Sequence, residues 1–86
     1  MASSIVVNVR YANLRSGFRD YVDEGLAPRS VGLQRDHIKE FHPYSWPGDV
    51  NVYSIIVAQA AAGVREDYFV QETVTAINSA LNAAEA

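Results

Sequence analysis

Residues 50–57, Val-Asn-Val-Tyr-Ser-Ile-Ile-Val, are the stretch that decides the fold. They are dense in β-branched and aromatic side chains, which favours a strand. The tripeptide before them, Pro-Gly-Asp at 47–49, suits a type II turn, because proline fixes φ at the first central position and glycine supplies the positive φ at the second. We therefore expect residues 38–46 and 50–58 to form a β-hairpin, with Pro43 placing the first arm at a sheet edge.

A helix is the competing interpretation of the same stretch. Asp49 would cap a helix over residues 50–62, and Gly63 would end it. The domain would then be mostly α. The density of β-branched residues leads us to expect the strand.

The segment before this hairpin predicts a strand and then a helix. Residues 4–11, Ser-Ile-Val-Val-Asn-Val-Arg-Tyr, have strand composition. A short helix is predicted over residues 17–26, before Pro28, because four apolar residues recur there at helical spacing: Phe18, Tyr21, Val22 and Leu26. Residues 29–37 allow either a loop or one helical turn.

The C-terminal segment predicts an amphipathic helix over residues 65–84. Its apolar seam consists of Val70, Val74, Ile77 and Leu81. Glu66 and Asp67 would lie in the first turn, where the helix dipole favours acidic side chains. The expected fold is therefore α+β, a small β-α-β-β-α domain with a mostly antiparallel sheet and two helices packed on one face.

Length and composition indicate one small globular domain over residues 1–86. The apolar fraction of 49% and the charged fraction of 20% are typical of a packed chain rather than a disordered one. A core of this size is modest, so a homo-oligomer is a possible arrangement. We expect a cytoplasmic protein without membrane contact, because no signal-peptide pattern and no long apolar run are present.

Charge and residue types exclude several classes of partner and cofactor. Residues 44–86 hold Arg65 against five acidic groups, and the isoelectric point is near 5.1, so we do not expect nucleic acid as a partner. The chain has no cysteine, which excludes disulfides and thiolate metal sites. Residues 36–42 combine histidines and carboxylates without an established zinc spacing, so we expect no metal and no cofactor.

An aromatic and proline-rich segment is the strongest candidate for a binding surface. Residues 41–47, Phe-His-Pro-Tyr-Ser-Trp-Pro, lie beside the predicted turn. Aromatic rings near a loop tip give large contact area at low entropic cost, and proline stiffens the segment. The predicted partner-binding residues are Tyr44, Trp46, Asp49, Tyr53, Glu66 and Asp67. We therefore expect a non-enzymatic protein–protein interaction module, a small subunit, adaptor or inhibitor of the kind found in phages and mobile elements, that binds a larger macromolecule through these rings and an acidic face.

The alternative function is a dimeric small-ligand domain or enzyme with a pocket between subunits. An arginine would bind an anionic ligand there and a histidine would move a proton. The candidates are Arg10, Arg15, Arg19, His37 and His42. The sequence contains no nucleophile-elbow motif and no phosphate-binding glycine loop, so no catalytic residue is assigned.

Overall fold

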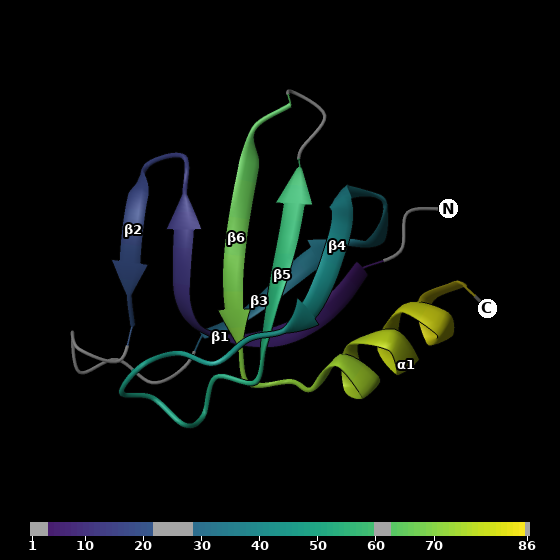
Figure 1. Cartoon of the computed structure of the whole chain (residues 1–86). Coiled ribbons are helices and arrows are strands. Elements are labelled where there is room, and N and C mark those ends of the chain that lie inside the picture. The colour runs from purple at the N-terminus through teal and green to yellow at the C-terminus, as the bar shows by residue number, and fades with distance from the viewer. Residues whose placement is uncertain (1–3, 22–28, 60–62, 86) are drawn as a thin grey trace.

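The computed structural model describes residues 4–21, 29–59 and 63–85 of the chain. Within them it has six strands, a short 3-10 helix and one α-helix (Figure 1). The elements in chain order are β1 (Ser4–Leu14), β2 (Gly17–Asp20), β3 (Arg29–Gln34), η1 (Arg35–His37), β4 (Ile38–Pro43), β5 (Ser54–Gln59), β6 (Arg65–Val70) and α1 (Val74–Glu85). The α+β class is therefore confirmed, whereas the expected second helix is wrong.

The long strand β1 connects two parts of an antiparallel sheet. The strand order is β2-β1-β6-β5-β4, and β3 pairs with β1 off this path. The first half of β1 pairs with β3, from Ser4↔Gln34 to Val9↔Arg29, and the second half lies between β2 and β6. The register shifts between Val9 and Tyr11, and such irregularities bend a strand. Figure 1 shows the result, because β3 and the first half of β1 cross behind β5 and β4.

The core lies between this crossing pair of strands and the sheet β6-β5-β4. Its largest fully buried apolar side chains come from β1, β5, β6 and α1: Val7, Val9, Ile56, Val70 and Ile77. The helix closes the core because Ile77 packs into it and α1 contacts β1 and β4.

Two local contacts position α1. Thr73 is its N-cap, and the Thr73 Oγ1 atom accepts a hydrogen bond from the backbone N–H of Ala76 at 3.2 Å. Glu72, in the connection from β6, accepts hydrogen bonds from the backbone N–H and the Nδ2 of Asn8 at 2.9 and 3.0 Å. The start of the helix is therefore tied to the middle of β1.

The helix expected over residues 17–26 is wrong where the structure describes it. Residues 17–20 form β2, which pairs with β1 from Leu14↔Gly17 to Tyr11↔Asp20. Gly17 has φ of +126°, a conformation unsuited to a helix. The free edge of β1 supplies backbone hydrogen bonds that a short solvent-exposed helix would lack, so tertiary pairing outweighs the helical spacing. Residues 22–26 lie outside the described residues.

The helix expected over residues 65–84 begins too early. Residues 65–70 form β6, between β1 and β5, and the helix spans Val74–Glu85. The spacing of Val70 and Val74 imitates a helical seam, but Val70 is buried as part of β6. Phe69 and Val70 are buried on opposite faces of the sheet, which is the alternation of a strand in the middle of a sheet.

The hairpin of β4 and β5 is confirmed, with a longer connection than expected. The strands pair antiparallel from Ile38↔Ala58 to Pro43↔Ser54, which excludes the alternative helix for residues 54–59; residues 60–62 are not described. The predicted turn is present inside the connecting loop 44–53, where the Asp49 N–H donates to the Trp46 carbonyl at 3.1 Å. Gly48 has φ of +86°, as the second central residue of a type II turn requires. The ambiguous residues 29–37 are β3 followed by η1.

Candidate functional site: an aromatic surface and a charged groove

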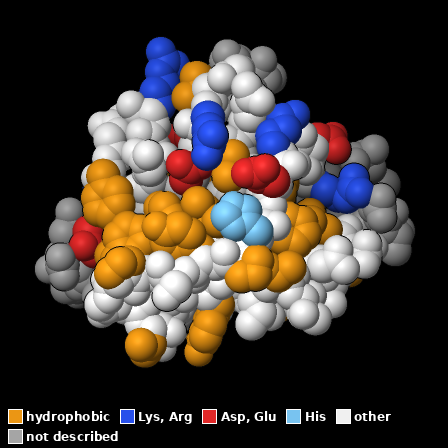
Figure 2. Space-filling model, in the orientation of Figure 1, with side chains coloured by type: hydrophobic (Ala, Val, Ile, Leu, Met, Phe, Trp, Pro, Cys, Tyr) orange, Lys and Arg blue, Asp and Glu red, His pale blue; other side chains and the backbone are white. Residues whose placement is uncertain are grey.

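The sheet face opposite the core, here called the outer face, gathers the chain's exposed rings and a set of charges. Side chains alternate across β5, so Ile56 enters the core while Ile55 packs on the outer face. Residues that are register partners point to the same side, which places Tyr11, Phe69 and Ile55 together. Figure 2 shows an apolar band across the middle of this view, with positive and negative side chains above it.

Five aromatic rings form one continuous cluster on the outer face. Trp46 stacks on Tyr11 with ring centroids 4.1 Å apart and planes inclined by 6°. Phe18 lies 5.9 Å from Trp46, nearly parallel to it. Phe69 meets Trp46 edge-on at 4.7 Å, and Tyr44 lies 5.1 Å from Phe69. The cluster thus joins β1, β2, β6 and the loop 44–53.

The rings of this cluster differ in exposure. Tyr11 and Phe69 are buried, whereas Trp46 is half-buried. Phe18 and Tyr44 are 55% and 37% exposed. We call Phe18, Tyr44 and Trp46 the aromatic surface. Its rings pack on the buried rings of Tyr11 and Phe69, so contacts within the domain hold them in place.

Asp49 anchors the loop that carries Trp46. The carboxylate is 8% exposed and its Oδ2 atom accepts hydrogen bonds from Arg10 Nε at 2.7 Å and Tyr11 Oη at 2.9 Å. Its Oδ1 atom accepts one from the backbone N–H of Asn51 at 3.0 Å. The first two contacts fix the loop to β1, and the third lies within the loop.

The environment of Asp49 shifts two pKa values. Burial alone would raise the pKa of Asp49, but the hydrogen bonds from Arg10, Asn51 and Tyr11 and the positive charge of Arg10 outweigh it, and the pKa lies below its usual value. Burial, together with the hydrogen bond to Asp49 and its negative charge, raises the pKa of Tyr11 to about 12. Asp49 is therefore ionised and Tyr11 protonated at neutral pH.

The structure separates the predicted partner-binding residues into three places. Tyr44 and Trp46 lie in the aromatic cluster, and Tyr53 is 53% exposed opposite Tyr44, whose N–H donates to the Tyr53 carbonyl at 3.1 Å. Asp49 is buried beneath the loop. The predicted acidic residues Glu66 and Asp67 are neighbours on β6 and point to opposite sides of it.

The two acidic residues of β6 have different neighbours. Glu66 accepts a hydrogen bond from the Tyr68 hydroxyl at 3.0 Å, and Asp67 accepts one from Arg65 Nε at 3.1 Å. Burial and the Glu66 carboxylate raise the pKa of Tyr68 to about 12. These acids therefore do not make one continuous surface.

Sequence reasoning missed the contribution of Phe18, Tyr11 and Phe69 to the cluster. Phe18 was expected on the buried stripe of a helix, and the hairpin of β1 and β2 instead brings it to the outer face. The alternation of polar and apolar residues at the end of β1 was the available signal for Tyr11.

The groups proposed for acid–base or metal chemistry are dispersed. Arg10 is engaged by Asp49, and the Arg19 guanidinium lies 5.5 Å from the centre of the Tyr21 ring. His37 belongs to η1, while His42 is exposed on β4 with its Nδ1 atom 3.2 Å from the Pro43 carbonyl oxygen. Among the described residues, no group of three or more histidine, aspartate or glutamate side chains could bind a metal ion together.

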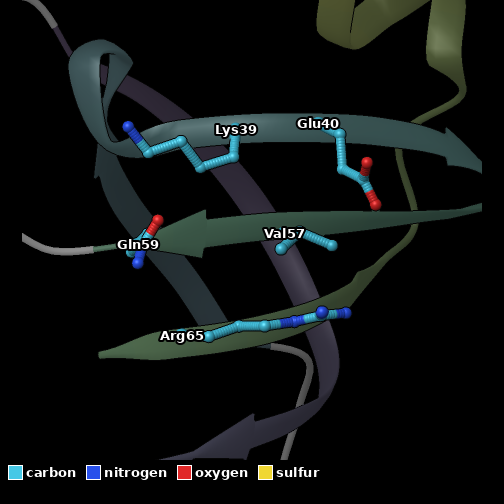
Figure 3. Close-up of a pocket in the computed structure, with 5 residues that line it drawn as sticks. All are labelled: Lys39, Glu40, Val57, Gln59 and Arg65. Carbon is cyan, nitrogen blue, oxygen red and sulfur yellow. The ribbon is translucent and has the colours of Figure 1, made fainter. Parts of the chain in front are cut away.

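A shallow groove of about 240 Å³ lies on the outer face beyond the aromatic cluster. Figure 3 shows Val57 of β5 between charged side chains from β4 and β6. The lining residues are Lys39, Glu40, Val57, Gln59 and Arg65. The register of β4 shifts between Ile38 and Glu40, which explains how the consecutive residues Lys39 and Glu40 both line one groove.

Comparison of the chain with protein-family models, with curated proteins and with solved structures finds no match. In the part of the chain that the structure describes, no helix is long and apolar enough to cross a bilayer. The function must therefore be argued from the geometry of the outer face.

Proposed function

We propose that this chain is a protein–protein interaction module, without catalytic activity of its own, that binds a larger macromolecule through the aromatic surface. The observation that supports the proposal is the five-ring cluster, in which exposed Phe18 and Tyr44 flank Trp46 on the outer face. Exposed aromatic rings that lie next to one another are typical of the central contacts of protein interfaces.

The rigid support of these rings favours binding. Trp46 is stacked on Tyr11, and its loop is fixed through Asp49 to Arg10 and Tyr11. Rings that are already ordered lose little conformational entropy on association, so more of the contact energy appears as affinity. The contact residues of the proposal are Phe18, Tyr44 and Trp46, extended by Tyr53.

Asp49 is not part of the proposed contact surface. Its carboxylate is buried and paired with Arg10, so a partner cannot reach it without opening the loop. It acts instead as a positioning residue for Trp46. This assignment replaces the acidic contact at Asp49 with a purely aromatic one.

The test uses exposed rings, because their removal leaves the buried base intact. A partner would first be captured from the native host with the wild-type chain and identified by mass spectrometry. We expect Phe18→Ser/Tyr44→Ser to weaken binding of that partner at least about tenfold, equivalent to about 1.4 kcal/mol. The single tryptophan gives a second readout, since a partner that covers Trp46 shifts its fluorescence.

Val6→Ser is the matched control. Val6 is 66% exposed, and it lies between Ile5 and Val7, whose side chains enter the core, so it points away from the core on the side remote from the outer face. We expect this variant to bind like wild type. Equal affinity of the wild type and Phe18→Ser/Tyr44→Ser for the partner would refute the proposal.

A further inference from the structure

The charged end of the outer face is arranged in two parallel rows of opposite sign. Glu40, Val57 and Asp67 are register partners across β4, β5 and β6, so they form one row with acidic ends. Gln59 and Arg65 are partners at the next outward-facing position, and the shifted residue Lys39 completes a row with basic ends. Figure 2 shows blue side chains above red ones near the middle of this face.

This pattern is complementary to itself. Successive outward positions on a strand are about 7 Å apart, which is the distance between the rows. Consider two copies whose outer faces face each other, related by a twofold axis between them. The axis runs parallel to the rows and lies midway between the acidic row and the basic row. It places the basic row of each copy over the acidic row of the other. Because the axis preserves position along the rows, Lys39 faces Glu40 of the second copy. Arg65, whose Nε atom is 3.1 Å from Asp67 Oδ1 of its own chain, also faces Asp67 of the second copy.

We propose that the chain forms a twofold homodimer through these two rows, with the outer faces of the two sheets packed against each other. The second copy is the occupant that the charges select, since the rows carry two basic and two acidic groups while the whole chain has a net charge of −3. Two copies therefore meet at a part of the surface without net repulsion, and every contact occurs twice, as an isologous interface requires.

The dimensions of the chain suit this interface. A stable interface buries about 800 Å² on each partner. The molecule measures 36 × 28 × 19 Å and exposes 5289 Å², so the required area is about 15% of its surface. Exposed ion pairs alone contribute little. The alkyl stems of Lys39 and Arg65 and the groove floor at Val57 supply the apolar contact between the rows.

The exposed rings lie differently with respect to the rows. Phe18 is the register partner of Asn13, which in turn pairs with Asp67, so Phe18 continues the acidic row on β2. Tyr44 lies in the loop 44–53 beside Phe69, at the end of β6 opposite Arg65. Tyr44 therefore lies away from the rows.

Charge exchange tests the dimer by sedimentation equilibrium of the full chain. Lys39→Glu/Arg65→Glu makes both rows acidic, and Glu40→Lys/Asp67→Lys makes both rows basic. We expect each variant to be monomeric by itself and an equimolar mixture to form a heterodimer. Circular dichroism of each variant checks that it is folded. A mixture that stays monomeric although both variants are folded overturns the proposal.

Wild-type protein provides a test that needs no variant. We expect its dimer to weaken at least about tenfold when salt rises from about 0.1 M to about 1 M, because screening shortens the range of the charges. A chain that remains monomeric up to about 1 mM would also overturn the proposal. The variant Tyr44→Ser separates this proposal from the proposed function, because Tyr44 lies away from the rows. It should dimerise normally while binding the partner more weakly, and loss of the dimer in that variant would refute the assignment to the rows.

Discussion

Trp46 lies flat on Tyr11, with the ring centroids 4.1 Å apart and the planes inclined by 6°. The two residues belong to a loop and to the longest strand, and the Tyr11 hydroxyl also donates to Asp49 at 2.9 Å, three residues after Trp46. Tyr11 therefore holds the same loop twice, by stacking and by a hydrogen bond. The exposed side of the domain is organised around this pair.

Replacement of Trp46 tests how much the stack stabilises the fold. We expect Trp46→Ala to lower the free energy of unfolding by about 2 kcal/mol. Removal of a fully buried ring typically costs about 3 to 5 kcal/mol, and the loss is smaller here because Trp46 is only half-buried. Trp46→Phe should lose less than half of that. Urea unfolding followed by far-ultraviolet circular dichroism measures both. An unchanged midpoint in Trp46→Ala would show that the loop does not rest on Tyr11.

Removal of the Asp49 charge tests the anchor. We expect Asp49→Asn to lower the free energy of unfolding by about 3 kcal/mol, because the half-buried guanidinium of Arg10 loses its partner. Asp36→Asn is the control, since Asp36 is exposed on η1 and should change stability by less than about 0.5 kcal/mol. Similar losses in the two variants would contradict an anchoring role specific to Asp49.

The loss of stability at acidic pH depends on the same carboxylate. The folded chain lowers the pKa of Asp49, so its stabilising contribution is present above the unfolded value of about 3.9 and is lost as the pH falls through the lowered folded pKa. We expect the Asp49→Asn variant to lose less stability than wild type between about pH 5 and pH 2. Thermal unfolding at a series of pH values measures the difference, and parallel curves would exclude Asp49 as a source of acid sensitivity.

Alkaline titration tests the two protected tyrosines. Tyr11 and Tyr68 have pKa values raised to about 12, so each stabilises the folded state fully below the unfolded value of about 10, and this contribution is lost as the pH rises through about 12. We expect a late component in the tyrosinate absorbance titration. Tyr11→Phe and Tyr68→Phe should each reduce it. A late component that survives both substitutions would contradict the buried environments.

Ser54 is expected to tolerate loss of its hydroxyl. The side chain is fully buried and its Oγ atom has no hydrogen-bond partner among the residues that the structure describes. A buried polar atom without a partner destabilises the fold, so Ser54→Ala should leave stability unchanged or raise it by up to about 1 kcal/mol. Thr73→Ala provides the contrast, because it removes the cap of α1 and should cost about 1 kcal/mol. Thermal denaturation of the two variants decides the matter, and a clear loss in Ser54→Ala would mean that the hydroxyl is satisfied in solution.

The sequence by itself determined the elements that depend on conformational preferences within a few neighbouring residues. β-branched residues predicted the strand within residues 50–58, Pro47 and Gly48 predicted the turn, and the C-terminal periodicity predicted α1, although the expected helix was extended back through β6 and its apolar seam included Val70 of that strand. The turn and the apolar seam depend on φ preferences and side-chain spacing within a few residues, so the sequence alone predicts them.

Only the tertiary structure decided which segments became sheet partners and which rings met. Residues 17–20 and 65–70 have helical spacing, yet they form strands because the two edges of β1 offer backbone partners at a distance in sequence. The same pairing buries Asp49 against Arg10 and brings Phe18 beside Trp46. Hydrogen bonds between distant segments and the burial they produce outweigh weak local preferences, and they have no signature in a short window of sequence.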